Sequence, residues 1–220
     1  MATPYFQLKR DIVASTQDIA REALEDLPVL VMARGQTEGR GRGGDPWVTA
    51  DRALAASLAF RCEPADTRPF SLMAGVAAVR SIPEAALKWP NDVLVGDGKA
   101  GGILVERRDD LVVVGFGANL WWREAPNHMT GIYREDPGED RYAEIGGFWG
   151  AELMRLIDGP DWPIEEYRTA CVTVGQPVTW EPDGSGHAVG IAPDGGLIVD
   201  TDRGRETIYS GAVRLVRHKP

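Results

Sequence analysis

The sequence predicts an α+β fold, a mixed β-sheet layered with helices, followed by a small all-β module. Segments with helical and strand periodicity alternate up to the region of Thr169, without the regular βαβ repeat of a parallel sheet. After Thr169 only short β-rich runs remain, cut by Gly, Asp and Pro turns. With 220 residues and 43% hydrophobic content, the chain can bury a sizeable core. We therefore expect two units, residues 1–169 and 170–220.

Local patterns justify the elements of the first unit. Ser15 and Asp18 have the spacing of a capping box, which predicts a helix that begins there and ends before Pro28. Two further helices are predicted over residues 72–82 and 143–156. Residues 121–141 are rich in Pro, Gly and charge, which predicts a loop. Strands are predicted over 29–33, 54–60, 87–89, 93–95, 102–107 and 111–117, the last two as a hairpin.

The second unit consists of short apolar runs typical of a small barrel or sandwich. Each run is rich in Val, Ile, Thr or an aromatic residue and is bounded by turn residues. The expected strands cover 172–174, 178–180, 187–191, 196–199, 207–209 and 213–216.

Composition excludes several classes of protein. The formal net charge of -9 argues against a nucleic-acid partner, because phosphate binding requires a concentrated basic face. Cys62 and Cys171 lack the spacing of a zinc site or a disulfide framework, so no metal site is expected. No signal peptide and no apolar run of membrane-spanning length is visible, which predicts a cytoplasmic protein without a membrane partner.

A glycine-rich loop with two arginines is the first candidate binding element. Gly39, Gly41 and Gly44 fit the dinucleotide pattern G-x-G-x-x-G, but no amphipathic helix follows and the parallel alternation is missing. Arg40 and Arg42 occupy alternate positions on this bare backbone, where both can converge on phosphate oxygens. The loop therefore predicts an anion site.

Two later runs carry similar chemistry. Lys88 lies on a predicted strand beside Leu87 and Trp89, a partly buried setting in which a cation needs an anionic partner. Asn91 adds a polar group within a few residues. Residues 99–104 place Lys99 and two glycines before a buried strand. Together with the first loop, these runs predict a site for a carboxylate and a polyphosphate.

The three runs resemble those of the biotin-protein ligases, and the resemblance extends over nearly the whole chain. It implies the fold of biotin/lipoate ligases, with an SH3-like C-terminal domain and without an N-terminal DNA-binding domain. It also implies Lys88, Arg40 and Arg42 as catalytic residues. The binding residues that it implies for biotin and ATP are Ser15, Thr16, Gln36, Gly39, Gly41, Trp47, Asn91, Lys99, Gly102 and Asn119.

The resemblance implies a two-step reaction. Such an enzyme uses ATP and Mg²⁺ to activate biotin as biotinyl-5′-AMP, then transfers it to a lysine of a biotin carboxyl carrier protein. A homodimer is compatible with the resemblance. Two positions depart from the family pattern: Asp45 carries the wrong sign inside the loop, and Arg52 stands where a glycine is expected. Two alternatives remain: a lipoate- or octanoate-protein ligase of related fold, and a non-catalytic ligand-binding relative, which the departures at Asp45 and Arg52 favour.

Overall fold

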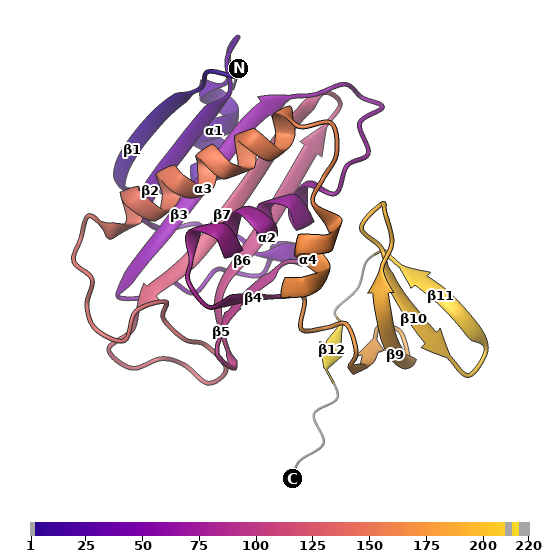
Figure 1. Cartoon of the computed structure of the whole chain (residues 1–220). Helices are drawn as coiled ribbons and strands as arrows, with labels where there is room; N and C mark the ends of the chain where they lie inside the picture. The colour runs from indigo at the N-terminus through magenta and orange to yellow at the C-terminus, as the bar shows by residue number, and fades with distance from the viewer. Residues whose placement is uncertain (1–2, 210–212, 216–220) are drawn as a thin grey trace.

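The computed structural model describes residues 3–209 and 213–215, and its first unit is built on a seven-stranded sheet (Figure 1). The strand order is β1-β2-β3-β7-β6-β5-β4. β1 pairs with β2 in parallel, and the other neighbours are antiparallel, so the predicted mixed sheet is confirmed. The strands are β1 (Phe6–Val13), β2 (Val29–Gln36), β3 (Arg52–Arg61), β4 (Ala85–Lys88), β5 (Asp92–Val95), β6 (Gly98–Arg108) and β7 (Leu111–Trp121).

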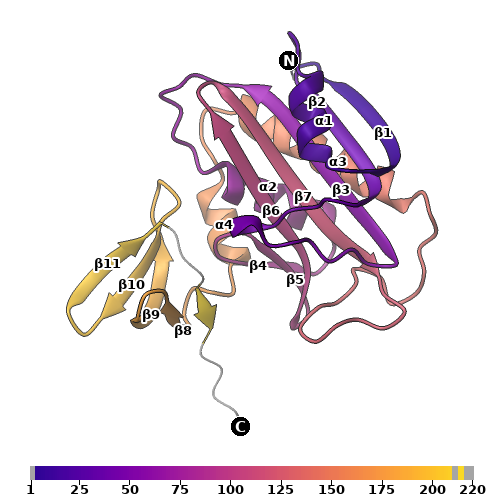
Figure 2. The ribbon, with the colours of Figure 1, turned by 180° about the vertical axis from the view of Figure 1, so that it is seen from behind.

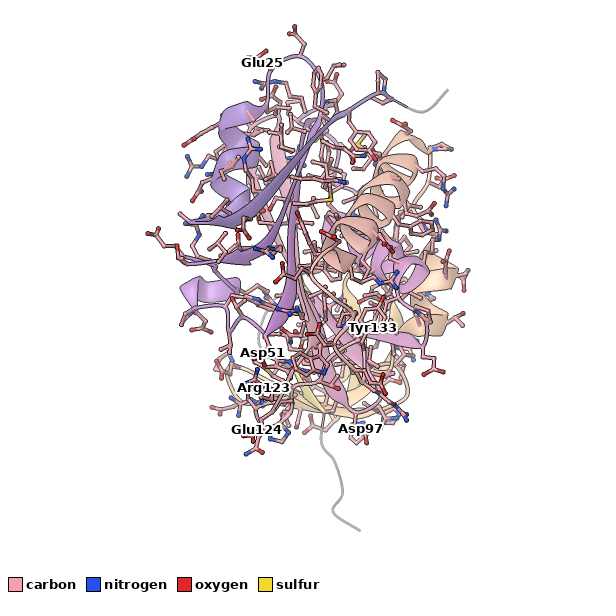
Figure 3. The ribbon with its side chains drawn as sticks, turned by 90° about the vertical axis from the view of Figure 1, so that its left-hand side faces the viewer. Glu25, Asp51, Asp97, Arg123, Glu124 and Tyr133 are labelled. Carbon is pink, nitrogen blue, oxygen red and sulfur yellow. The ribbon has the colours of Figure 1, made fainter. Side chains whose placement is uncertain are left out.

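Helices cover both faces of this sheet. α1 (Thr16–Ala23) lies on one face, and α2 (Phe70–Ser81) and α3 (Arg141–Asp158) cover the other, as the edge-on view in Figure 3 shows. α1 begins where predicted, because the Ser15 Oγ accepts the Asp18 N–H at 3.3 Å. None of the helices within the described residues is both long and apolar enough to cross a membrane.

The main core lies between the sheet and α3. Trp149 is fully buried, and its ring centroid lies 5.4 Å from that of Phe116 on β7. Gly150 allows α3 to approach the sheet closely, since a Cβ there would lie 2.4 Å from the Leu30 Cδ2. This packing covers one face of the sheet, and α1 covers only part of the other.

The predicted all-β module of SH3-like type is confirmed as a five-stranded antiparallel sheet. Its strand order is β11-β10-β9-β8-β12. Buried aliphatic side chains, among them Ile191 and Leu197, form its interior. Val216, which ends the last predicted run, lies outside the described residues. The strands are β8 (Pro177–Trp180), β9 (Gly184–Ile191), β10 (Leu197–Thr201), β11 (Gly204–Ile208) and β12 (Arg214–Leu215).

Several elements differ from the sequence expectation. β1 and α4 (Ile164–Ala170) were not expected, and α1 ends at Ala23 rather than just before Pro28. The strand expected over 172–174 is wrong, because these residues form turns that cover the edge of β4. The boundary near Thr169 stays a prediction; Thr169 itself lies in α4, and the second sheet starts at Pro177.

Candidate functional site

A cavity of about 620 Å³ lies on the α1 face of the sheet, where the three sequence motifs meet. Figure 2 shows the loop between β2 and β3 crossing this face in front of the sheet. Glycines and small residues of β3, β6 and β7 form the floor of the cavity. The predicted site residues that line it are Ser15, Thr16, Gln36, Arg40, Gly41, Arg42, Trp47, Lys88, Asn91, Lys99 and Gly102.

Two predicted site residues lie behind the lining. Gly39 packs against other site residues, since a Cβ there would lie 3.0 Å from the Gln36 Nε2 and 3.2 Å from the Trp47 Cβ. Asn119 is buried, and its Nδ2 donates to the Lys99 carbonyl oxygen at 3.5 Å. Both residues contact the lining rather than the cavity itself.

One group of lining residues is polar and uncharged. The Gln36 Oε1 accepts hydrogen bonds from the Thr16 N–H at 2.7 Å and from the Thr16 hydroxyl at 3.0 Å. The Ser57 Oγ lies 2.8 Å from the Thr16 Oγ1. Ser57 was missed by the sequence analysis, because it lies within an otherwise apolar strand. This cluster can offer donors and acceptors to an uncharged polar ligand group.

Gln17 joins this polar group and was also missed as a site residue. The residue is 6% exposed, and neither its Oε1 nor its Nε2 has a hydrogen-bond partner within the described part of the chain. Gly115 on β7 makes room for it, since a Cβ at that position would lie 2.8 Å from the Gln17 Oε1. An unpartnered buried amide is costly for the free protein. Its position directly after Ser15 and Thr16 was the available sequence signal.

The glycine-rich loop is anchored to α1 through Arg40. Its Nη2 donates to the Asp18 carboxylate at 2.8 Å and lies 3.4 Å from the Ser15 Oγ. This hydrogen bond from Arg40, aided by Arg21, lowers the pKa of Asp18 to about 2. Gly43 and Gly44 have φ values of 73° and 86°, which lets the loop reverse inside the short 3₁₀ turn η1 (Arg42–Gly44).

Arg42 links the first motif to the second. Its Nη1 donates to the Asn91 Oδ1 at 3.3 Å, and the Asn91 Nδ2 donates to the Ile103 carbonyl oxygen at 2.9 Å. The second motif is thereby tied to both the loop and β6.

Two lysines share one carboxylate at the cationic end of the cavity. Asp92 lies 3.2 Å from the Lys88 Nζ and 2.5 Å from the Lys99 Nζ. The Lys99 ammonium also lies 5.9 Å from the centroid of the Trp47 ring. Because one carboxylate cannot neutralise two ammonium groups, a positive charge remains for a ligand.

Trp47 lies flat against two glycines of the sheet. A Cβ at Gly117 would lie 2.9 Å from the Trp47 Cζ2, and one at Gly102 would lie 3.1 Å from its Cζ3. Any larger residue at these positions would displace the indole ring. Gly102 of the third motif and Gly117 on β7 therefore set the depth at which this aromatic wall lies.

Arg52 and Asp45, the two residues that depart from the expected pattern, line different cavities. Arg52 pairs with Asp136 at 3.0 Å and lines a separate, smaller cavity, so it does not fill the main one. Asp45 does line the main cavity, and its backbone carbonyl accepts the Gly41 N–H at 2.7 Å.

The lining is basic although the chain is acidic. Its ionisable side chains are five cations and two carboxylates, in a chain of net charge -9. Arg214, contributed by the C-terminal module, was missed because nothing in the sequence places β12 beside the first unit. Such an excess of cations favours an anionic ligand. The cationic residues are Arg40, Arg42, Lys88, Lys99 and Arg214, and the carboxylates are Asp45 and Asp92.

Known proteins resemble both units. Residues 11–119 match the biotin/lipoate A/B protein ligase family, and residues 173–216 match the biotin protein ligase C-terminal domain. A biotin–[acetyl-CoA-carboxylase] ligase of Paracoccus denitrificans is 36% identical over 92% of this chain and 98% of its own. One of Mycobacterium tuberculosis is 31% identical over 86% of this chain and 76% of its own.

A solved structure agrees with these matches. The biotin protein ligase of Aquifex aeolicus, in complex with biotin and ATP, superposes with a TM-score of 0.81 at 25% identity. The similarity covers 97% of this chain and 99% of the other. Fold, cavity and the extent of these matches agree, and the chain belongs to the biotin protein ligase family.

Proposed function

We propose that the protein is an ATP-dependent biotin–[carboxyl carrier protein] ligase that acts through biotinyl-5′-AMP. The observation that carries the proposal is the pairing, in one cavity, of an uncharged polar cluster with a cluster of excess cations. Biotin has matching chemistry, with an uncharged ring system at one end and a carboxylate at the other. The names of the Paracoccus and Mycobacterium relatives support the same reaction.

The uncharged cluster suits the ring system of biotin. Thr16, Gln36 and Ser57 are hydrogen-bonded to one another. Their remaining donors and acceptors are therefore fixed in direction before a ligand enters. The buried amide of Gln17 gains partners only when a polar ligand group reaches it. Trp47 supplies the apolar wall for the carbon skeleton.

In the first step the biotin carboxylate attacks the α-phosphate of ATP and pyrophosphate leaves. The carboxylate is ionised at neutral pH and needs no general base. Its difficulty is repulsion from the triphosphate, which Lys88, Arg40 and Arg42 offset. Lys99 keeps Asp92 partly neutralised, so the Lys88 ammonium remains available to the reacting oxygens.

Mg²⁺ is proposed to arrive with ATP. The described residues contain no group of three or more His, Cys, Asp or Glu side chains that could hold a metal ion. Mg²⁺ bound through phosphate oxygens, with one or two carboxylates at most, fits the lining, in which Asp45 and Asp92 are the carboxylates. The ion would supply further neutralisation of the triphosphate charge.

In the second step the carrier lysine attacks the acyl carbon of the adenylate. An amide bond forms, the bond between the acyl carbon and the phosphate oxygen breaks, and AMP leaves. The lysine must lose a proton from a pKa near 10.4, and water must be kept away from the anhydride. The loop that carries Arg40 and Trp47 lies over the sheet glycines in the position of such a cover.

The test is exchange of labelled pyrophosphate into ATP, measured with biotin, with lipoate, with octanoate and with no acid. Exchange that depends on biotin alone supports the proposal. Exchange with lipoate or octanoate instead would favour the lipoate-type ligase, and folded protein without exchange would favour a binding relative. Labelling of a purified carrier domain of a biotin-dependent carboxylase then tests the acceptor.

Three related expectations stay predictions. They are the cytoplasmic location, a homodimer and the division into units near Thr169. Gel filtration with light scattering would test the dimer.

A further inference from the structure

The chain that follows α4 lies along the free edge of β4, the strand that ends in Lys88. The Val172 N–H donates to the Leu87 carbonyl oxygen at 2.8 Å. One residue beyond Lys88, the Trp89 N–H donates to the Thr173 Oγ1 at 2.9 Å. The backbone is thus held on both sides of Lys88 by two consecutive residues of the same segment.

The Thr173 hydroxyl contacts this strand end in a buried setting. Its side chain is 0% exposed, and Trp89 is 2% exposed, so water cannot replace the hydroxyl as acceptor. The indole N–H of Trp89 donates to the Gly195 carbonyl oxygen at 3.0 Å. Both N–H groups of Trp89 are therefore bound by residues beyond α4, while Pro90 provides no N–H of its own.

The alternation of side chains along β4 determines the face on which Lys88 lies. Successive side chains of a strand lie on opposite faces of the sheet, and Leu87 and Trp89 are both buried in the core. Lys88 consequently projects to the other face, where it lines the cavity and reaches Asp92. Rotation of the peptide between residues 88 and 89 would tilt the lysine away from the ligand.

We propose that Thr173 is a positioning residue for Lys88: its hydroxyl fixes the Trp89 amide and thereby aims the lysine into the cavity. The proposal rests on the proposed function, because it assigns Lys88 to the adenylation step. Positioning is valuable there, since a misplacement on the order of 1 Å can cost about 10²-fold in rate.

The test compares two substitutions. Thr173→Val keeps the shape of the side chain but removes the acceptor, and we expect kcat of biotin-dependent pyrophosphate exchange to fall roughly tenfold. The KM for biotin should change little, because the uncharged cluster is untouched. Thr173→Ser keeps the hydroxyl and should restore most of the rate. Thr169→Val is the matched control, since its hydroxyl donates to the Glu165 carbonyl oxygen within α4.

A double-mutant cycle separates positioning from general destabilisation. If Thr173 acts through Lys88, Thr173→Val should have little effect on the residual rate of Lys88→Ala, measured at high enzyme concentration. An equal tenfold loss in that background would overturn the proposal. So would a rate of Thr173→Val equal to that of the wild type.

A second readout does not depend on activity. Hydrogen exchange of the Trp89 amide, followed by NMR in the free protein, should become about tenfold faster in Thr173→Val and remain slow in Thr173→Ser. Unchanged exchange in Thr173→Val would refute the positioning role. Absence of biotin-dependent exchange in the wild type would instead refute the proposed function, so the two failures are distinguishable.

Discussion

Replacing Lys88 by alanine should abolish most adenylation while leaving the fold nearly intact. Lys88 and Lys99 lie 3.2 and 2.5 Å from the carboxylate of Asp92, so removing Lys88 leaves that carboxylate paired at the shorter distance. The Lys88 side chain is 26% exposed, and a partly exposed ion pair contributes only about 1 kcal/mol or less to stability. We therefore expect a change in unfolding free energy of about 1 kcal/mol at most.

The expected loss in rate is far larger. In a site that excludes water, one preorganised charge on the reacting oxygens is worth about 3–4 kcal/mol, or roughly 10² to 10³ in kcat. Lys88→Arg should recover little, because a planar guanidinium does not replace a compact ammonium between the cavity and Asp92. Lys9→Ala, on the exposed strand β1, is the matched control.

Both quantities are measured on one preparation, by biotin-dependent pyrophosphate exchange and by denaturant unfolding. A Lys88→Ala protein that unfolds several kcal/mol more easily, yet turns over normally per folded molecule, would refute the reasoning. Lys88 would then serve only to hold Asp92 in the fold.

Three further predictions concern other parts of the site. Gln17→Leu should stabilise the free protein by about 1–2 kcal/mol by removing an unpartnered amide, and should weaken biotin binding in calorimetry. Gly117→Ala should displace Trp47 and raise the KM for biotin about tenfold, with a shift in tryptophan fluorescence. Asp18→Asn should lower stability at pH 7 by about 1 kcal/mol or less, because the bond to Arg40 is partly exposed. The folded pKa of Asp18 is about 2, below its ordinary value of 3.8, so this difference should shrink as pH falls from about 4 to 2.

Each of these predictions has its own contrary result. If the Gln17→Leu protein binds biotin as tightly as the wild type, the Gln17 amide does not contact biotin. Gln7→Leu, at an exposed position, is the control. Gly117→Ala is compared with Gly147→Ala, where a Cβ meets nothing within 4 Å, and equal kinetics would show that Trp47 does not set the pocket. For Asp18→Asn, a stability difference that persists at pH 2 would rule out the ionised carboxylate as its source.

The sequence predicted much of the first unit because local signals were strong there. The alanine-rich run over 72–82 and the pattern over 143–156 correspond to α2 and α3. β1 escaped prediction because it is a charged edge strand whose apolar side chains are partly exposed, so it lacks clear alternation. α4 buries only Tyr167, and its seven residues carry too little periodicity to be recognised.

Candidate site residues were predictable where they form contiguous motifs. Those that come together only through tertiary contacts were not. The cations of the three motifs line one cavity, and their roles in it stay predictions. Ser57 and Arg214 could not be found, because one is isolated in an apolar strand and the other belongs to a different sheet. The strand expected over 172–174 was predicted from its β-branched residues but does not form. These residues instead cover the edge of β4.

The contacts along β4 also determine how the protein can be divided. A chain ending at Ala170 would leave the Leu87 carbonyl and the Trp89 amide without their partners and would open a sheet edge to other molecules. Truncated first units would therefore associate through the open edge of β4. The orientation of Lys88 would also no longer be fixed. The segment that follows α4 acts in this respect as an inbuilt edge cap, and solubility and activity should be lost together when this segment and the C-terminal module are removed.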